Sequence, residues 1–494
     1  MRAPADRPQT PPDPPCELRG RRALDHNLRV SSDPQIPASA TAVAAAVRAR
    51  QVSAVAVTAA ALEHVARVNA PLNAIVTLNP RALDEALRLD ARVAAGEDAG
   101  LLAGVPVGIK DITPVAGLRT TYGSPIFADH VPAADAVAVA RLRAAGAIVI
   151  GKTNTPEFAA GANTWNDVFG RTRNPWNPAL SAGGSTGGGA AALAAGMIAL
   201  AEGTDLGGSL RIPAAFCGVV GLRPTPGLVP THPSDWVWDT ISVSGPMART
   251  VEDVALMLQV MAGASPCAPL GQARAGRDFV AAATGGVATG LRVGYCAEIA
   301  GIGMDESIGV VCREAAHALR SPALSVTDLD LDLSAYRDAF LTLRAEWFIA
   351  SMYDKLADLE RFGVNVRGNT DAGLALDGRA LGAAHHARGR LWHHMRALFT
   401  RVDCLLTPTV AVPPFPVEQN YPGEVAGRAM RTYVDWFAPT FLLSLTGLPV
   451  ASVPCGVDAR GLPVGMQVVG PPNGEETVLA LAAAIQRRFP VALP

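Results

Sequence analysis

The sequence has few aromatic residues and almost no net charge. Phe, Trp and Tyr make up 5% of the 494 residues, and 42 Lys and Arg nearly balance 44 Asp and Glu, leaving a formal net charge of −2. Proteins that bind nucleic acids carry a basic excess, so no nucleic-acid partner is expected. Hydrophobic residues make up 49% of the chain, which suffices for a sizeable core and excludes global disorder.

The cysteines lack the spacing of a disulfide framework or a zinc ribbon. There are seven, and no two form a Cys-x-x-Cys pair. This pattern favours a reducing compartment, and we expect a cytoplasmic protein. Residues 1–37 are Pro-rich and aperiodic, so a disordered tail is predicted there. The first residues also lack the apolar segment of a signal peptide.

One long uncharged run, Trp436–Val457, invites comparison with a membrane span. It is interrupted by Pro439, Gly447 and Pro449. A spanning helix tolerates such residues poorly, so no membrane association is expected. We predict instead a buried helix followed by a buried strand at Leu448–Cys455.

Helical and strand-like segments alternate along the rest of the chain, which predicts an α/β fold. Residues 151–180 form a long irregular run of the kind that is usually functional. The predicted helices cover 41–50, 54–68, 80–95, 136–145, 250–262, 306–320, 333–361, 378–401 and 475–488. The predicted strands cover 104–109, 147–150, 291–295, 324–329, 404–406, 450–454 and 463–469.

The most distinctive segment is Ser181–Thr225. Two Gly-Gly-Ser turns, at 183–185 and 207–209, flank an Ala-rich helix and a short strand. Paired glycines let successive N–H groups point into one concavity, which suits an anion. That anion is either a bound phosphate or an oxyanion formed during catalysis.

Two familiar interpretations of this segment fail. A Walker-type phosphate loop needs Gly-Lys-Ser/Thr, and no such lysine is present. Residues 183–187 match the Gly-x-Ser-x-Gly nucleophile elbow, but residues 174–182 before it do not read as a buried strand. The last histidine, His394, is also followed by 100 residues, whereas the hydrolase triad places its histidine near the C-terminus.

A lysine base is the third interpretation. Lys110 follows the apolar strand GVPVGI. Burial lowers the pKa of a lysine, and a neutral lysine can accept the proton of a serine that attacks a carbonyl. From the residues alone, Lys110 could also be a surface lysine, and Ser185 and Ser209 could be small turn residues.

The same residues resemble the amidase signature family of serine hydrolases. Resemblance covers about residues 40–490 and is weakest at 265–435. It rests on Lys110, Ser185 and Ser209, which are separated by 75 and 24 residues. The supporting stretches are LLAGVPVGIKD, GAIVIGKTNTPEFA, RNPWNPALSAGGSTGG, GTDLGGSLRIPA, ISVSGPMARTVEDVALML and TGLPVASVPCG.

The resemblance implies a role for each of these residues. Ser209 is the acylated nucleophile, Ser185 lies in a cis peptide and relays the proton, and Lys110 is the base. Asp205 and Arg211 hold the nucleophile loop. The implied oxyanion hole consists of the N–H groups of Leu206, Gly207, Gly208 and Ser209.

The family resemblance also implies a fold. We expect a central mixed β-sheet with helices on both faces over residues 38–494, and a more variable, largely helical insertion at 265–400. No cofactor or metal is implied. His385, His386, His393 and His394 cluster in one predicted helix, but they lack the close spacing and the nearby acid of a metal site.

The implied activity is hydrolysis of amide C–N bonds in hydrophobic or aryl small molecules, with aryl carbamates as a second class. The alternative is a glutamine-hydrolysing subunit of a tRNA amidotransferase. Such subunits place an acid for the substrate ammonium where counting gives Phe437, two residues after Asp435. Phe437 is therefore a candidate pocket residue, and so is Cys217, which can equally be a small buried residue.

A catalytically dead binding module is a third hypothesis. The presence of Lys110, Ser185 and Ser209 together argues against it.

For the oligomeric state, we expect a monomer or homodimer.

Overall fold

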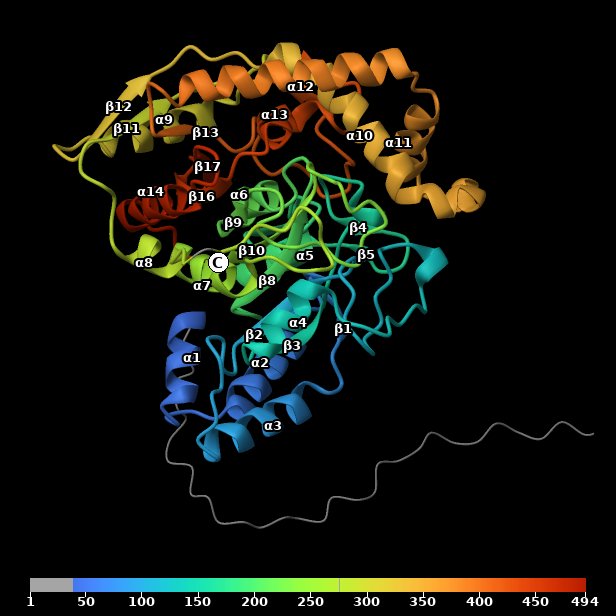
Figure 1. Ribbon diagram of the computed structural model, residues 1–494, viewed down its shortest axis with the longest axis vertical. Helices are drawn as coiled ribbons and strands as arrows, with labels where there is room; N and C mark the ends of the chain where they lie inside the picture. Colours follow the sequence, from blue (N-terminus) through green and yellow to red (C-terminus); the bar gives the residue numbers. More distant parts are fainter. Residues whose placement is uncertain (1–38, 275) are drawn as a thin grey trace, which may run out of the picture. The chain divides into compact units, whose positions relative to one another are not determined.

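Within the described residues, eleven strands form one mixed sheet (Figure 1). The computed structural model describes residues 39–494 except residue 275, so the predicted tail at 1–37 lies outside the described residues. The strand order is β1(Ile75–Leu78), β3(Ile148–Thr153), β2(Pro106–Lys110), β8(Leu200–Asp205), β10(Val243–Ala248), β9(Val220–Arg223), β16(Val450–Val457), β17(Pro463–Val469), β13(Cys404–Pro408), β11(Leu291–Tyr295), β12(Leu324–Asp328).

Parallel pairing is confined to the two sides of this sheet. β2 pairs in parallel with β3 and β8, and β11 pairs in parallel with β12 and β13. The pairs from β8 across to β13 are antiparallel, as is β1 with β3. Parallel strands need crossover connections, and the helices in those connections cover the sheet.

Helices cover both faces of the sheet, as expected for the amidase signature fold. Two groups of helices pack among themselves: α5 packs against α6, and α14 packs against α7 and α8. The helices are α1(Ala40–Arg48), α2(Ala54–Val68), α3(Ala82–Ala94), α4(Val137–Ala144), α5(Gly187–Ala194), α6(Arg211–Cys217), α7(Val251–Met261), α8(Phe279–Thr284), α9(Glu306–Ala318), α10(Arg337–Met352), α11(Val364–Leu374), α12(Gly378–Leu398), α13(Ala438–Thr446) and α14(Glu475–Arg488).

The segment 265–400 contributes to the sheet as well as to a helical layer. Its strands β11 and β12 form one edge of the sheet. The helical part follows β12, where α10 contacts both α11 and α12, and α13 contacts α10 and α12 (Figure 1). The division of the chain into a tail, a main domain and an insertion stays a prediction.

The uncharged run at 436–457 folds as predicted, into the buried helix α13 and then the strand β16. Across residues 39–494, with 275 set aside, no helix combines the length and the apolar character needed to cross a membrane. The irregular run at 151–180 contains two short strand pairs, β4(Trp165–Asn166) with β5(Gly170–Arg171) and β6(Arg173–Asn174) with β7(Asn177–Ser181).

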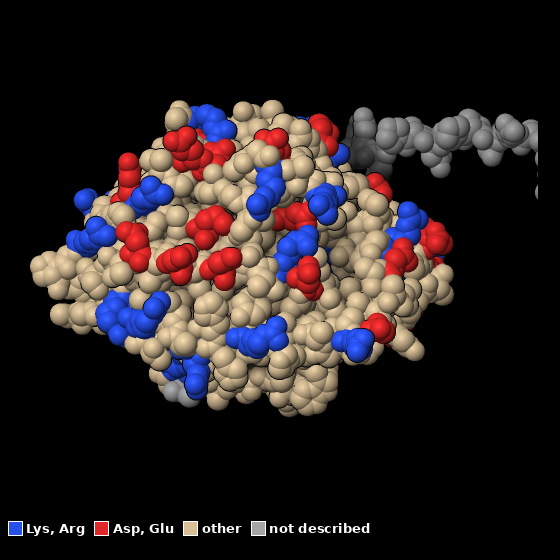
Figure 2. All heavy atoms as spheres, turned by 90° about the horizontal axis from the view of Figure 1, so that it is seen from above, with Lys and Arg blue, Asp and Glu red and all other residues tan. Residues whose placement is uncertain are grey.

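Side chains of both charges are interspersed on the face shown in Figure 2. This distribution agrees with the near balance of acidic and basic residues in the sequence. The expected cytoplasmic location and the monomeric or homodimeric state stay predictions.

Candidate active site

Lys110 lies at the end of β2 with no exposed surface. Its Nζ donates hydrogen bonds to Ser185 Oγ at 2.7 Å, Thr204 Oγ1 at 2.9 Å and Thr186 Oγ1 at 3.0 Å. A protonated amine has three N–H donors, so the three hydroxyls satisfy all of them. The structure therefore brings Lys110 and Ser185 together, as the sequence predicts.

The environment of Lys110 favours its neutral form. Burial lowers the pKa of Lys110 to about 7, although the negative charges of Glu202 and Asp205 act in the opposite direction. The hydrogen-bond partners of Nζ are hydroxyls, which do not hold a positive charge as a carboxylate would. A substantial fraction of Lys110 is consequently unprotonated at neutral pH.

Ser185 is fully buried and follows a cis peptide bond from Gly184, as predicted. Gly183 before it has a φ of +74°, and a side chain there would meet the backbone of Pro213 at 2.9 Å. The N–H of Thr186 donates to the carbonyl oxygen of Ser209 at 3.1 Å. The segments that carry the two serines are thereby held side by side.

Asp205 organises the loop that carries Ser209, between β8 and α6. Its carboxylate accepts the N–H of Gly208 at 2.9 Å and the N–H of Leu210 at 3.2 Å. Gly208 has a φ of +131°, and a side chain there would lie 2.3 Å from Thr440 Oγ1. The loop conformation thus depends on a glycine at 208 and on an ionised carboxylate at 205.

Two buried arginines hold the charge of Asp205. Arg211 Nε and Nη2 donate to the two carboxylate oxygens at 3.0 and 2.9 Å, and Arg223 Nη1 lies 3.4 Å from Oδ1. Burial alone would raise the pKa of Asp205. The charge and hydrogen bonds of Arg211, the charge of Arg223 and the Leu210 N–H outweigh burial and lower the pKa well below its usual range.

The predicted oxyanion hole needs one correction. The Gly208 N–H is directed at Asp205, and an N–H with a single hydrogen is then not free for a substrate oxyanion. Within the described chain, the N–H groups of Leu206, Gly207 and Ser209 make no hydrogen bond. These three remain as candidate donors.

A small cavity opens at Ser209, with a volume of about 240 Å³ including the part open to solvent. Ligand pockets usually measure about 300–1,000 Å³, so larger substrates must extend outside it or displace its walls. Phe437, predicted as a pocket residue, does line it. The other lining residues are Ala159, Gly161, Ala162, Gly184, Gly207, Ile212, Arg344 and Tyr433.

Cys217 does not line this cavity, and its prediction as a pocket residue is wrong. It is the last residue of α6, fully buried, with Sγ 3.5 Å from the carbonyl oxygen of Ala182. Burial raises the pKa of the Cys217 thiol, which keeps it protonated and unreactive. The alternative interpretation, a small buried residue, is the one the structure supports.

The contacts of the Asp435 carboxylate are with residues that do not line the cavity. It forms an ion pair with Arg337, and its Oδ2 accepts the N–H groups of Arg431 and Thr432, each at 2.9 Å. Burial opposes ionisation, but these hydrogen bonds and the Arg337 charge lower the pKa of Asp435. Its carboxylate is therefore committed to local structure rather than to a ligand beside Phe437.

The four clustered histidines lie on α12. His385 Nε2 lies 3.5 Å from Glu346 Oε2 on α10. Among the described residues, no three His, Cys, Asp or Glu side chains are placed together to hold a metal ion.

Sequence reasoning missed several polar residues around the site. Thr186 and Thr204 stand inside the quoted motifs, next to Ser185 and Asp205, so their positions offered a signal. Lys152 follows the predicted strand at 147–150, and the sequence suggests only a polar residue at a strand end. In the structure Lys152 is fully buried. Burial lowers its pKa to about 8, although the negative charges of Asp111 and Glu202 act in the opposite direction. Arg344 comes from the segment with the weakest family resemblance, where no motif marks it.

Asp205→Asn tests the buried charge network. The substitution removes the carboxylate that forms ion pairs with both Arg211 and Arg223. Breaking a buried ion pair costs about 3–5 kcal/mol, so we expect a loss of that order in the free energy of unfolding at pH 7. Denaturant unfolding of both proteins measures it. An unchanged midpoint would show that the network does not stabilise the fold.

Comparison with known proteins agrees with this geometry. Residues 56–479 match the protein family named Amidase. The chain is 38% identical over 458 residues to an acylamidase of Rhodococcus erythropolis, covering 90% of this chain and 94% of the relative. It is 37% identical over 466 residues to a glutamyl-tRNA(Gln) amidotransferase subunit of Roseiflexus sp. (strain RS-1), covering 88% and 93%.

A solved structure points the same way. The crystal structure of a bacterial aryl acylamidase of the amidase signature enzymes superimposes with a TM-score of 0.84 and 29% identity, covering 91% of this chain and 96% of that one. From the family match, the relatives and this structural similarity together, the chain belongs to the amidase signature family and is an amidohydrolase that acts on carbon–nitrogen bonds.

Proposed function

We propose that this enzyme hydrolyses amides bearing an apolar or aryl group, through an acyl-enzyme on Ser209. The observation that carries the proposal is the composition of the cavity wall at Ser209, where Phe437 and Ile212 lie and no carboxylate does. Such a wall favours apolar groups. Aryl carbamates of the urethane type present a comparable carbonyl to Ser209 and form the second substrate class.

The proposed acylation begins with neutral Lys110. Ser209 Oγ attacks the carbonyl carbon while its proton passes to Ser185 Oγ, and the proton of Ser185 passes to Lys110 Nζ, 2.7 Å away. The carbonyl oxygen becomes an oxyanion and accepts the free N–H groups of the 206–209 loop. Collapse of this intermediate breaks the C–N bond, and the leaving amine takes the proton back through Ser185.

Deacylation repeats these steps with water. A water molecule attacks the Ser209 ester and gives its proton to Lys110 through Ser185, and the returning proton restores the Ser209 hydroxyl. The products are a carboxylic acid and an amine. Lys110 thus acts as base and then as acid in each half of the reaction.

The alternative function is glutamine hydrolysis as part of a tRNA amidotransferase. It is favoured by 37% identity to a glutamyl-tRNA(Gln) amidotransferase subunit. A glutamine substrate carries an ammonium group that needs a nearby carboxylate. The nearest predicted acid, Asp435, is paired with Arg337, and the cavity wall contains the cation Arg344 instead. These contacts support the stand-alone amidase.

A panel of p-nitroanilides, aryl carbamates and glutamine separates these functions. We expect turnover of apolar anilides and slower or no release of ammonia from glutamine. Glutamine turnover that exceeds every anilide and carbamate would favour the amidotransferase function. A fluorophosphonate probe should label Ser209, and failure of both labelling and turnover would indicate a catalytically dead binding module.

Ser209→Ala should abolish turnover, with a loss of about four orders of magnitude or more, because the nucleophile defines the chemical route. The unfolding midpoint should stay close to that of the wild type, since Ser209 is partly exposed. Mass spectrometry of substrate-trapped enzyme should find the acyl group on Ser209. An adduct on Ser185 or Cys217 would overturn the assignment.

Ser185→Ala should be less damaging than Ser209→Ala, with a loss of about 10²–10⁴-fold in kcat, because a water molecule can partly replace the relay. Lys110 keeps Thr186 and Thr204 as hydrogen-bond partners in this variant. Single-turnover rates on one anilide compare the two variants directly. A Ser185→Ala loss as large as that of Ser209→Ala would contradict a replaceable relay.

The activity should rise with pH through about 7, where the pKa of Lys110 lies. The base must be neutral, so kcat/KM falls as the pH drops below this pKa and levels off above it. No histidine lines the cavity among the described residues. The measurement is the pH dependence of kcat/KM for the wild type and Lys110→Ala, which should lose this limb and about 10²–10⁴-fold in rate.

Lys110→Arg serves as the control for positive charge alone. Guanidinium stays charged at working pH, so this variant should not recover activity. A pH profile of Lys110→Ala that matches the wild type would mean that another group is the base.

A further inference from the structure

Arg344 is a buried cation on the wall of the cavity that contains Ser209. It lies on α10, its residue surface is 6% exposed, and it lines the cavity together with Tyr433 and Phe437. No carboxylate of the described residues forms an ion pair with it. A buried charge without a partner of opposite sign is costly, so its position calls for a compensating group.

The surroundings of Arg344 hold the side chain in place without neutralising it. Nε donates to Asn369 Oδ1 at 3.0 Å, and Nη2 donates to the Tyr433 hydroxyl. The guanidinium also lies over the rings of Phe348 and Tyr433, 5.0 and 5.5 Å from their centroids. Aromatic faces favour a cation but leave its net charge in place.

Part of the guanidinium remains available. Within residues 39–494 apart from 275, Nη1 of Arg344 makes no hydrogen bond, and it is not among the fully enclosed polar atoms without a partner. Nη1 is therefore not fully enclosed by the protein, and the side chain that carries it lines the cavity. Its N–H groups can therefore reach a ligand bound beside Ser209.

Tyr433 adds a second donor to the same wall. Its hydroxyl oxygen accepts hydrogen bonds from Arg344 Nη2 and Asn369 Nδ2, each at 2.5 Å. A hydroxyl that accepts two bonds still has its own hydrogen to donate. The wall thus offers an O–H and a guanidinium N–H, and no carboxylate lies among its lining residues.

We propose that Arg344 and Tyr433 bind a carboxylate group of the substrate, so that the preferred substrates are amides with an apolar part and an acid group. The inference rests on the proposed amidase function at Ser209. A carboxylate accepts several hydrogen bonds and supplies the missing negative charge, and the planar guanidinium matches its geometry. An additional ammonium on the substrate would meet a cation and find no acid on the cavity wall.

Two matched pairs of amides test the proposal, because the carboxylate could lie on either side of the scissile bond. In the first pair the acyl group varies, and glutaryl 4-nitroanilide is compared with 5-methylhexanoyl 4-nitroanilide. In the second pair the leaving amine varies, and 4-acetamidobenzoate is compared with 4-isopropylacetanilide. In each pair an isopropyl group replaces the carboxylate at nearly constant shape.

The wild type should prefer the acid in at least one pair, by about tenfold or more in kcat/KM, the range of a hydrogen bond to a charged group. Arg344→Met should lower that acid-to-neutral ratio by about tenfold or more. Arg344→Lys, which keeps the charge, should retain part of it, and Tyr433→Phe should reduce it less than Arg344→Met. γ-Glutamyl 4-nitroanilide, which adds an ammonium to the glutaryl group, should be cleaved more slowly than glutaryl 4-nitroanilide.

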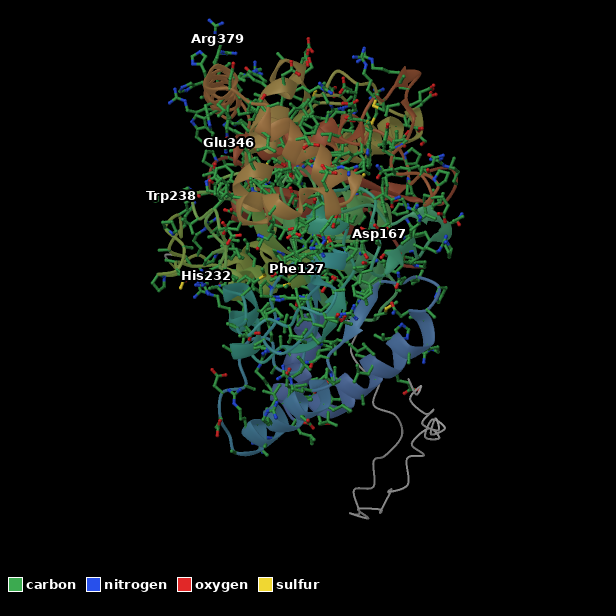
Figure 3. The ribbon with its side chains drawn as sticks, turned by 90° about the vertical axis from the view of Figure 1, so that its right-hand side faces the viewer. Phe127, Asp167, His232, Trp238, Glu346 and Arg379 are labelled. Atoms are coloured by element: carbon green, nitrogen blue, oxygen red, sulfur yellow. The ribbon has the colours of Figure 1, made fainter. Side chains whose placement is uncertain are left out.

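Arg379→Met is the matched control, because Arg379 on α12 is exposed and projects away from the body of the protein (Figure 3). It should leave the acid-to-neutral ratio unchanged. Equal turnover of acid and neutral amides by the wild type in both pairs would overturn the inference. So would an equal loss on both members of a pair in Arg344→Met and Arg344→Lys, because a purely structural role lowers both alike.

The role of Arg344 and the proposed amidase function are refuted by different results. If neutral anilides are hydrolysed without any preference for the acids, only the role of Arg344 is refuted. If neither acids nor neutral anilides are hydrolysed and Ser209 is not labelled by a fluorophosphonate, the proposed amidase function is refuted, and the role of Arg344 falls with it.

Discussion

The ionised carboxylate of Asp205, enclosed by Arg211 and Arg223, is the interaction on which the rest of the site depends. It fixes the N–H groups of Gly208 and Leu210, so it sets the backbone on both sides of Ser209. Arg211 continues the network to Ser444 and to the backbone of Thr440 on α13. Because Phe437 immediately precedes α13, one buried charge links the nucleophile loop to the wall of the cavity.

The hydrogen bonding of Lys110 is the second constraint on the site, and its partners are neutral hydroxyls rather than charged groups. Its hydrogen-bond partners are three hydroxyls, two from Ser185 and Thr186 directly before α5 and one from Thr204 near the end of β8. Hydroxyls can accept from an ammonium and donate to an amine, so the same contacts serve both protonation states of the lysine. A carboxylate in contact with Nζ would instead hold the proton and remove the base.

The sequence could predict those parts of the site that lie within contiguous motifs. Lys110 and Ser185 meet because each lies near the end of a regular element in a recognisable stretch. The direction of one N–H at Gly208 and the burial of Cys217 depend on how α6 packs, which no motif encodes. Arg344 and Tyr433 come from α10 and from the turn before α13, and their positions follow from helix packing in the variable segment. In the fold, the sequence predicts β11 and β12 as strands, but not that they form an edge of the main sheet.

Burial of Lys110 also affects how the protein holds together. An unfolded chain has its lysines titrating at about 10.4, whereas the pKa of Lys110 in the folded protein is about 7. Between these values the unfolded chain binds more protons, so the free energy of unfolding increases as the pH rises through this window. Lys152, with its pKa lowered to about 8, acts in the same direction. Near neutrality the burial of these lysines therefore lowers the stability of the fold, and this cost disappears at alkaline pH, where the same lysines are neutral in the unfolded chain as well.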